Sequence, residues 1–231
     1  MWIRNDGSLH VAYFNDEWQV LQEFVQDAAS KGYDVVLLTP KQCLERSPGL
    51  NPVGLIGGMY SRTELNIDPR QALNLLHNYL AEKLGVAIHY RTAISHIDGN
   101  RLSGAGQEWR ADQIIVASGA DLTTLYPGWH NSASLTQSKL QMMRTFAQDR
   151  DYNLGANLAA GLTLLHYASF SECPGLSRVR ERFQSEMPEY LDHGIHVMVS
   201  ATSKNELTIG DSHEYGRDFP PFNHARINEL I

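Results

Sequence analysis

Short apolar strands and amphipathic helices follow one another along this 231-residue chain without the strict alternation that a doubly wound parallel sheet requires. The clearest helix begins at Asp68-Pro69, because Asp can cap a helix and Pro suits its first turn, and Gly85 ends it. A β-rich stretch follows, with a turn of hairpin type at residues 98–100. We therefore expect an α+β fold with a mixed or antiparallel sheet.

Apolar periodicity locates the other elements. Alternating or continuous apolar runs predict strands at residues 9–14, 35–38, 54–60, 86–89, 92–97, 113–117, 136–146, 162–170, 195–201 and 206–210. Helical spacing predicts helices after Asp16 and at residues 40–45, 69–84 and 176–187. The turn Ser203-Lys204-Asn205 predicts a hairpin between the last two strands.

The balance of charges is acidic, with 26 Asp and Glu against 19 Lys and Arg. Binding to nucleic acid is not expected, because phosphate contacts need a basic patch and no cluster of Lys or Arg appears. No apolar run approaches the length of a membrane span, so no membrane partner is expected either. Cys43 and Cys173 fit no C-x-x-C pattern, and we interpret them as reduced thiols of a cytoplasmic protein.

The segment Val116-Ala117-Ser118-Gly119-Ala120 leads an apolar run directly into Ser-Gly. A backbone without a side chain can approach a ligand closely, and the N–H groups of such a turn can meet a pyrophosphate. A plain strand-to-helix turn would have the same sequence. Spacing alone therefore leaves both interpretations open.

Several segments repeat, in order, the pattern of a known group of enzymes. They are Leu65-Asn66-Ile67-Asp68-Pro69-Arg70 with the helix after it, Gly85-Val86, Thr92-Ala93-Ile94, and the run from Ala111 to Ala120. Together they resemble the D-amino-acid oxidase superfamily, FAD-dependent enzymes that include glycine oxidase and sarcosine oxidase. The resemblance implies that Ile94 contacts the adenine of FAD through its backbone. It also implies that Ser118, Gly119 and Ala120 lie beside the FAD phosphates.

A narrower resemblance covers most of the chain. It rests on segments such as Gly7-Ser8-Leu9-His10, Arg62-Thr63-Glu64-Leu65, Leu140-Gln141-Met142-Met143-Arg144-Thr145, Gly194-Ile195-His196-Val197-Met198 and the run from Glu206 to Gly216. These segments look like a subgroup of the oxidases that is associated with phosphonate breakdown. Together the two resemblances imply the substrate-binding portion of an oxidoreductase that oxidatively deaminates an amine, an amino acid or an aminophosphonate, with a small anionic amine as the expected substrate.

The same resemblance implies three parts. Residues 1–85 would form the first part of a substrate domain with its helices, and residues 86–133 part of the FAD-binding domain, with a β-meander and the Ser-Gly turn. Residues 134–231 would form the second part of the substrate domain.

Two features of the family's pattern have no counterpart in the chain. The first is the Gly-rich dinucleotide fingerprint, because Gly54, Gly57 and Gly58 follow a Pro loop and lead into a strand. The second is the family's closing segment. We therefore expect a truncated middle portion that takes up FAD weakly or not at all and is inactive alone. Apolar surface that a flavin domain would cover makes a homo-oligomer a further expectation.

Three residues are candidates for substrate binding. Arg144 lies in an apolar strand, where its guanidinium needs a carboxylate or an anionic substrate as partner if it is buried. His196 belongs to the mixed face of its predicted strand, and His213 follows a strand among turn residues, where functional groups are common. No residue is assigned as a catalytic base, since the flavin carries the chemistry in this scheme.

A metal site is not expected. His193 and His196 are three residues apart, which places their side chains on opposite faces of a strand, and no H-E-x-x-H or Cys-His set is present. Two alternatives to the oxidase stay open: a non-catalytic, truncated module of that fold, and a His-based metal hydrolase.

Overall fold

The computed structural model describes residues 2–231 and divides them into two compact units. Unit 1 holds the residues up to Leu73 together with Lys139–Glu214 and Phe219–Ile231, and unit 2 holds Asn74–Ser138 and Tyr215–Asp218. The three-part division expected from the resemblance, with boundaries at 85/86 and 133/134, stays a prediction.

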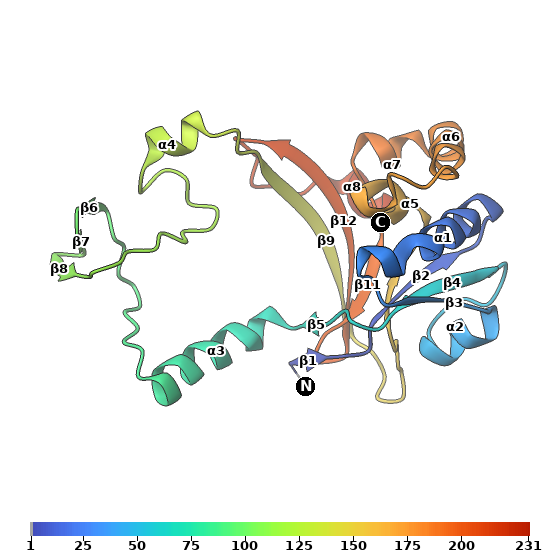
Figure 1. Ribbon diagram of the computed structural model, residues 1–231, viewed down its shortest axis with the longest axis horizontal. Coiled ribbons are helices and arrows are strands. Elements are labelled where there is room, and N and C mark those ends of the chain that lie inside the picture. The colour runs from blue at the N-terminus through green and yellow to red at the C-terminus, as the bar shows by residue number, and fades with distance from the viewer. Residues whose placement is uncertain (1) are drawn as a thin grey trace. The chain divides into compact units, whose positions relative to one another are not determined.

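A seven-stranded sheet forms the centre of unit 1 (Figure 1). Its strands, in spatial order, are β3 (Val35–Leu38), β4 (Gly57–Ser61), β2 (Ser8–Ala12), β10 (Asn157–Ala159), β11 (Met198–Ala201), β12 (Glu206–Gly216) and β9 (Gln137–Ala147). Strand β10 runs parallel to β2, whereas β3–β4, β4–β2, β10–β11 and β11–β12 are antiparallel. A separate two-stranded pair joins β1 (Ile3–Arg4) to β5 (Asn66–Ile67). The expected mixed sheet of an α+β fold is therefore confirmed.

Helices cover both faces of the sheet's β3–β4–β2 end. Helices α1 (Asn15–Ala28) and α2 (Pro40–Arg46) lie on opposite faces, and α5 (Gly161–His166) and α6 (Leu176–Glu186) pack against α1. Helix α7 (Pro188–Asp192) contacts α6, and α8 (Ala225–Leu230) packs against Ile195. On one face Ala12 and Met59 pack with α1 and α6, and on the other Leu9 and Val11 pack against Cys43 of α2. Because successive side chains of a strand alternate between faces, Ser8 and His10 share the α1 face with Ala12.

Local signals placed the starts of α2 and α3 (Pro69–Leu84) correctly, whereas α1 begins at Asn15, so the predicted cap Asp16 lies inside its first turn. Thr39 caps α2 as predicted: its hydroxyl accepts from the Gln42 N–H, and the Gln42 side chain accepts from the Thr39 N–H at 2.9 Å. Helix α3 begins at the predicted Pro69, where the Asp68 carboxylate accepts from the Arg70 N–H at 3.1 Å. Cys43 and Cys173 are free and buried thiols.

Unit 2 contains most of α3, the three-stranded meander β6 (His96–Asp98), β7 (Arg101–Gly104) and β8 (Gln107–Arg110), and the short helix α4 (Pro127–Ser132). No apolar side chain between residues 74 and 138, all of which the structure describes, is buried. The run Ile114-Ile115-Val116 illustrates this, since the Ile115 side chain is 89% exposed.

Three sequence predictions of strands are wrong, and a fourth, at residues 92–97, forms a strand only from His96 onward. Residues 162–170 form α5 and a 3-10 turn (Ala168–Phe170), because a short apolar run does not by itself distinguish a buried strand from a buried helix. Residues 86–89 and 113–117 are irregular. Each run has strand-like side chains but, in the described part of the chain, no neighbouring strand to complete its ladder of hydrogen bonds. Among residues 2–231, no helix combines the length and the apolar character needed to cross a membrane.

Candidate functional site

A hollow of about 490 Å³ lies on the α1 face of the unit 1 sheet. Its floor is made by alternate residues of β2, β4, β10, β11 and β12, which pair in register across that face. Phe24, Tyr167 and Phe170 form part of its wall. Volumes of this size are typical of pockets for small ligands, and most of the lining is apolar. We call this hollow the sheet pocket.

Two buried polar side chains of the sheet pocket, Ser8 and His10, have no partner in the described part of the chain. The Ser8 hydroxyl and both ring nitrogens of His10 are buried without a hydrogen bond in the described part of the chain. Glu64, an exposed carboxylate, also lines the pocket. Burial lowers the pKa of His10, although the negative charge of Glu64 acts in the opposite direction. The His10 ring is therefore neutral at pH 7, and each of its nitrogens is available to a ligand.

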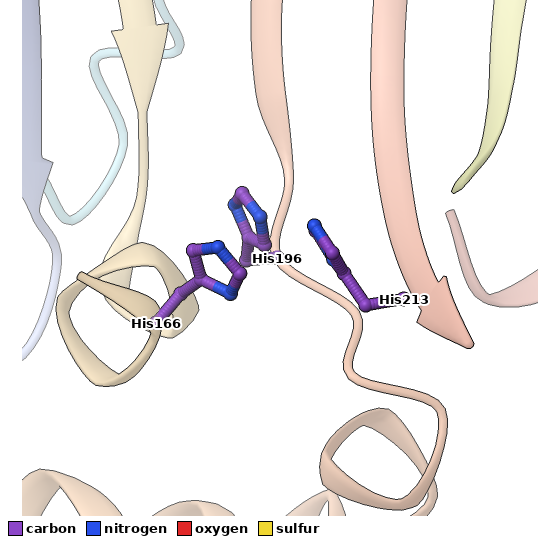
Figure 2. Close-up of side chains that lie close together, drawn as sticks. All are labelled: His166, His196 and His213. Carbon is purple, nitrogen blue, oxygen red and sulfur yellow. The ribbon is translucent and has the colours of Figure 1, made fainter. Parts of the chain in front are cut away.

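Three imidazoles converge beside the sheet pocket (Figure 2). His166 ends α5, His196 lies two residues before β11, and His213 belongs to β12. The rings of His166 and His196 stack at 3.9 Å between centroids, and those of His196 and His213 at 5.0 Å. We call these residues the histidine cluster. Tyr167, which lines the sheet pocket, packs edge-on against His196 at 5.9 Å.

Burial and mutual repulsion set the charge of the cluster. Burial, together with repulsion from charged His166 and His213, lowers the pKa of His196 to about 4. Burial also lowers the pKa of His166. The Asp211 carboxylate lies 3.3 Å from His196 Nε2, and burial raises the pKa of Asp211. His196 and His166 are consequently neutral at pH 7.

The predicted substrate residues separate into two places. The fold brings His196 and His213 together, but Arg144 lies on β9 with its side chain 53% exposed and its Nε 3.9 Å from a Glu206 carboxylate oxygen. Glu206 is seven residues from His213 along β12, or about 23 Å of extended chain. Arg144 instead borders a second hollow of about 540 Å³, which Asp68 and Arg70 also line.

The residues predicted to bind a cofactor lie in unit 2. Ile94 and Ser118 line one hollow of about 340 Å³, whose other walls are mainly apolar side chains from residues 97–125. Gly119 has φ +62°, and a side chain added there would meet no neighbouring atom within 4 Å, so the turn exposes its backbone. Ala120 is exposed beside it. An apolar slot leading to an open backbone turn fits a flat aromatic base followed by phosphates.

Sequence reasoning missed Ser8, His10, Glu64 and His166. The signal for the first two was available, since Ser8 and His10 are polar residues at alternate positions of an otherwise apolar strand. Glu64 lies in a connecting segment without periodicity. His166 was missed because its segment was interpreted as a strand.

Comparison with known proteins identifies relatives of the whole chain. A profile of the family described as FAD dependent oxidoreductase (DAO) matches residues 1–231. Among solved structures, glycine oxidase from Geobacillus kaustophilus is similar with a TM-score of 0.66 and 19% identity over 99% of this chain and 53% of that one. L-proline dehydrogenase from P. horikoshii is similar with a TM-score of 0.69 and 14% identity over 98% of this chain and 54% of that one.

A third similar structure is L-α-glycerophosphate oxidase from Mycoplasma pneumoniae with FAD bound, with a TM-score of 0.60 and 17% identity over 99% of this chain and 56% of that one. The chain thus spans about half the length of the solved structures that it matches. A search of curated proteins finds no match. At these identities the structural likeness establishes the fold.

Proposed function

This chain belongs to the family of FAD-dependent oxidoreductases, and on that premise we propose that it supplies the substrate-binding sheet of an enzyme that oxidatively deaminates a small amine. The sheet pocket is the observation that carries this proposal. It is largely apolar, and among its polar groups the Ser8 hydroxyl and the His10 ring nitrogens have no hydrogen-bond partner in residues 2–231, while the Glu64 carboxylate also lines it.

The Glu64 end of the sheet pocket suits an amine. A carboxylate attracts an ammonium group, and the neutral His10 ring offers an acceptor nitrogen to an N–H donor. Oxidation of an amine needs its neutral form, because a protonated nitrogen has no free electron pair to assist departure of the hydride. A single carboxylate beside a neutral imidazole can bind the ammonium and hold the released proton.

The histidine cluster suits the opposite, anionic end of the substrate. Tyr167 lies between the two ends, because it lines the sheet pocket and packs edge-on against His196. Burial raises the pKa of Tyr167, and the negative charges of Asp211 at one end and Glu64 at the other raise it further. An amino acid or an aminophosphonate carries an amine and an anion a few bonds apart, which matches this arrangement. His196 and His213 are the proposed positioning residues at that end.

The turn of unit 2 is the proposed contact with FAD. Ile94 would border the adenine, and Ser118, Gly119 and Ala120 would approach the phosphates through their backbone. FAD, when bound, supplies the hydride acceptor. The residues of this chain bind and orient the amine and exclude water from it.

Calorimetric titration tests the amine-binding role directly. The purified chain is titrated with glycine and an aminoalkylphosphonate, and with acetate and an alkylphosphonate, which lack the amine. Glu64→Gln should weaken the two amines roughly tenfold to a hundredfold, as expected for a lost hydrogen bond to a charged group, and leave the other two ligands unchanged.

Glu181→Gln, an exposed carboxylate on α6, is the matched control and should bind all four ligands like the parent. Equal affinity for amines and their deaminated counterparts, or no effect of Glu64→Gln, would show that the sheet pocket is not an amine site.

A further inference from the structure

Three segments that are distant in sequence place three imidazoles in one spot. His166, His196 and His213 each offer a ring nitrogen, and these nitrogens all lie within 4.8 Å of one another. His196 is 2% exposed, and both of its ring nitrogens are buried without a hydrogen-bond partner in residues 2–231. A buried polar ring with two unsatisfied nitrogens is costly unless a ligand completes its bonding.

The surroundings of His213 orient its ring as metal sites do. Histidines that bind metals usually direct their second nitrogen to a carboxylate or a backbone carbonyl, which fixes the tautomer and the ring plane. The Gly194 carbonyl lies 3.2 Å from His213 Nδ1. The Asp211 carboxylate lies 3.3 Å from His196 Nε2 without a hydrogen bond between them, so it contributes a nearby acidic group rather than an orienting bond. Gly194 can take this position because it has φ +58° and no side chain facing His213.

We propose that His166, His196 and His213 bind one divalent transition-metal ion of borderline softness, such as Zn²⁺. Imidazole is a preferred ligand of such ions. In a tetrahedral site with metal–nitrogen bonds near 2.0–2.1 Å, any two ligand nitrogens lie about 3.4 Å from each other. His166 is exposed at the end of the short helix α5, so rotation of its side chain can close the gap around the more buried His196.

Three protein ligands leave a fourth coordination position open, as in catalytic rather than structural zinc sites. Tyr167 and Met198, whose hydroxyl and sulfur are 3.5 Å apart, connect the histidine cluster to the sheet pocket. An anionic oxygen of a ligand in that pocket, or a water molecule, can occupy the open position. Metal binding itself does not depend on the proposed oxidase function; only this role toward a substrate does.

Cobalt titration provides the test, because tetrahedral Co²⁺ bound by nitrogen ligands absorbs visible light more strongly than the hexaaquo ion. The full chain is stripped with a chelator and titrated with Co²⁺ and, in competition, with Zn²⁺. One ion per chain should bind, with visible absorption bands that Zn²⁺ abolishes. His166→Gln should remove stoichiometric binding, and His96→Gln, an exposed histidine on β6, should bind like the parent.

Asp211→Asn should weaken ion binding, about tenfold or more, because it removes an acidic group 3.3 Å from a ring nitrogen of the ligand His196. Circular dichroism spectra that match the parent establish that the variants are folded, and the exposed His166 makes this the expected result. The proposal is overturned if the parent shows no saturable Co²⁺ bands. It is equally overturned if folded His166→Gln binds Co²⁺ with the parent's affinity.

Discussion

Histidine residues in this chain differ by their surroundings rather than by their sequence neighbours. His10 and His96 both occupy strands, but His10 is enclosed by the sheet pocket and packs against Phe170, whereas His96 lies on the exposed meander. Burial penalises the charged imidazole, so it lowers the pKa of His10 from its ordinary value.

Stability should fall as pH decreases below about 6.5. In that range the unfolded chain binds a proton at His10, whose pKa is lower in the folded protein, so acid favours unfolding. The contribution of His10 to stability is present above the pKa of the unfolded chain and is lost as pH falls through the pKa of the folded protein. For one histidine the free energy of unfolding changes by at most about 1.4 kcal/mol per pH unit. Urea unfolding at several pH values measures it.

Other groups contribute to the slope of the parent. The pKa values of His166 and His196 are also lowered, with the same sign, and the raised pKa of Asp211 acts in the opposite direction. Comparison with His10→Gln isolates the contribution of His10. In this variant the free energy of unfolding should depend less steeply on pH between pH 5 and 6.5, a range set by the ordinary pKa of histidine. His96→Gln should keep the parent's slope, and identical slopes in all three proteins would contradict the prediction.

At the scale of elements, two helices with similar patterns have different environments. Helices α1 and α3 both carry apolar residues at helical spacing, as the sequence predicted. In α1 the stripe is buried, with Leu21 0% exposed, because it packs on the sheet. In α3 no residue is buried, and Leu76 is 51% exposed. An amphipathic pattern thus establishes a helix without specifying what covers its apolar face.

The same substitution in these two helices should have different effects. Leu21→Ala removes fully buried methyl groups and leaves a cavity, so it should lower the free energy of unfolding by about 2–5 kcal/mol. Leu76→Ala should change it by no more than about 0.5 kcal/mol, since a half-exposed side chain leaves no cavity. Parallel urea denaturation of the two variants measures the difference. A comparable loss in Leu76→Ala would mean that this face of α3 is covered in solution.

At the scale of the molecule, the two units differ in what stabilises them. All three clusters of buried apolar residues belong to unit 1, and they pack against its sheet or its terminal helix. Unit 2 has a hydrogen-bonded meander and helices but no buried apolar side chain among residues 74–138. Segments with few buried contacts open at little cost in free energy.

Limited proteolysis should therefore cleave unit 2 first. Cuts are expected in the irregular segments 86–95 and 111–126 before any in the unit 1 loop 48–54, which is also exposed but is closed by the buried Leu50 and Leu55. Mass spectrometry of a time course identifies the order. Cleavage of the 48–54 loop at the same rate or earlier would show that unit 2 is as stable as unit 1.

The sequence by itself determined the features that depend on near neighbours. The capped start of α2, the start of α3 at Pro69 and the β11–β12 hairpin arise from residues that interact within a few positions of one another, and they occur as predicted. The family resemblance, which rests on ordered segments, is likewise confirmed by the match over residues 1–231. Periodicity could not decide the segment 162–170, because an apolar run of that length suits a buried helix as well as a strand.

Only the tertiary structure decided which side chains meet. Arg144 and His213 were predicted to serve one substrate, but the length of β12 separates them, and Arg144 lies near Glu206 instead. His166, which no sequence pattern singled out, stacks on His196 because α5 folds onto the sheet beside β11. The three residues of the histidine cluster lie 17 to 47 positions apart in the sequence. Such contacts depend on how helices and strands bury their apolar faces against each other, and that packing is not encoded in the spacing of any single segment.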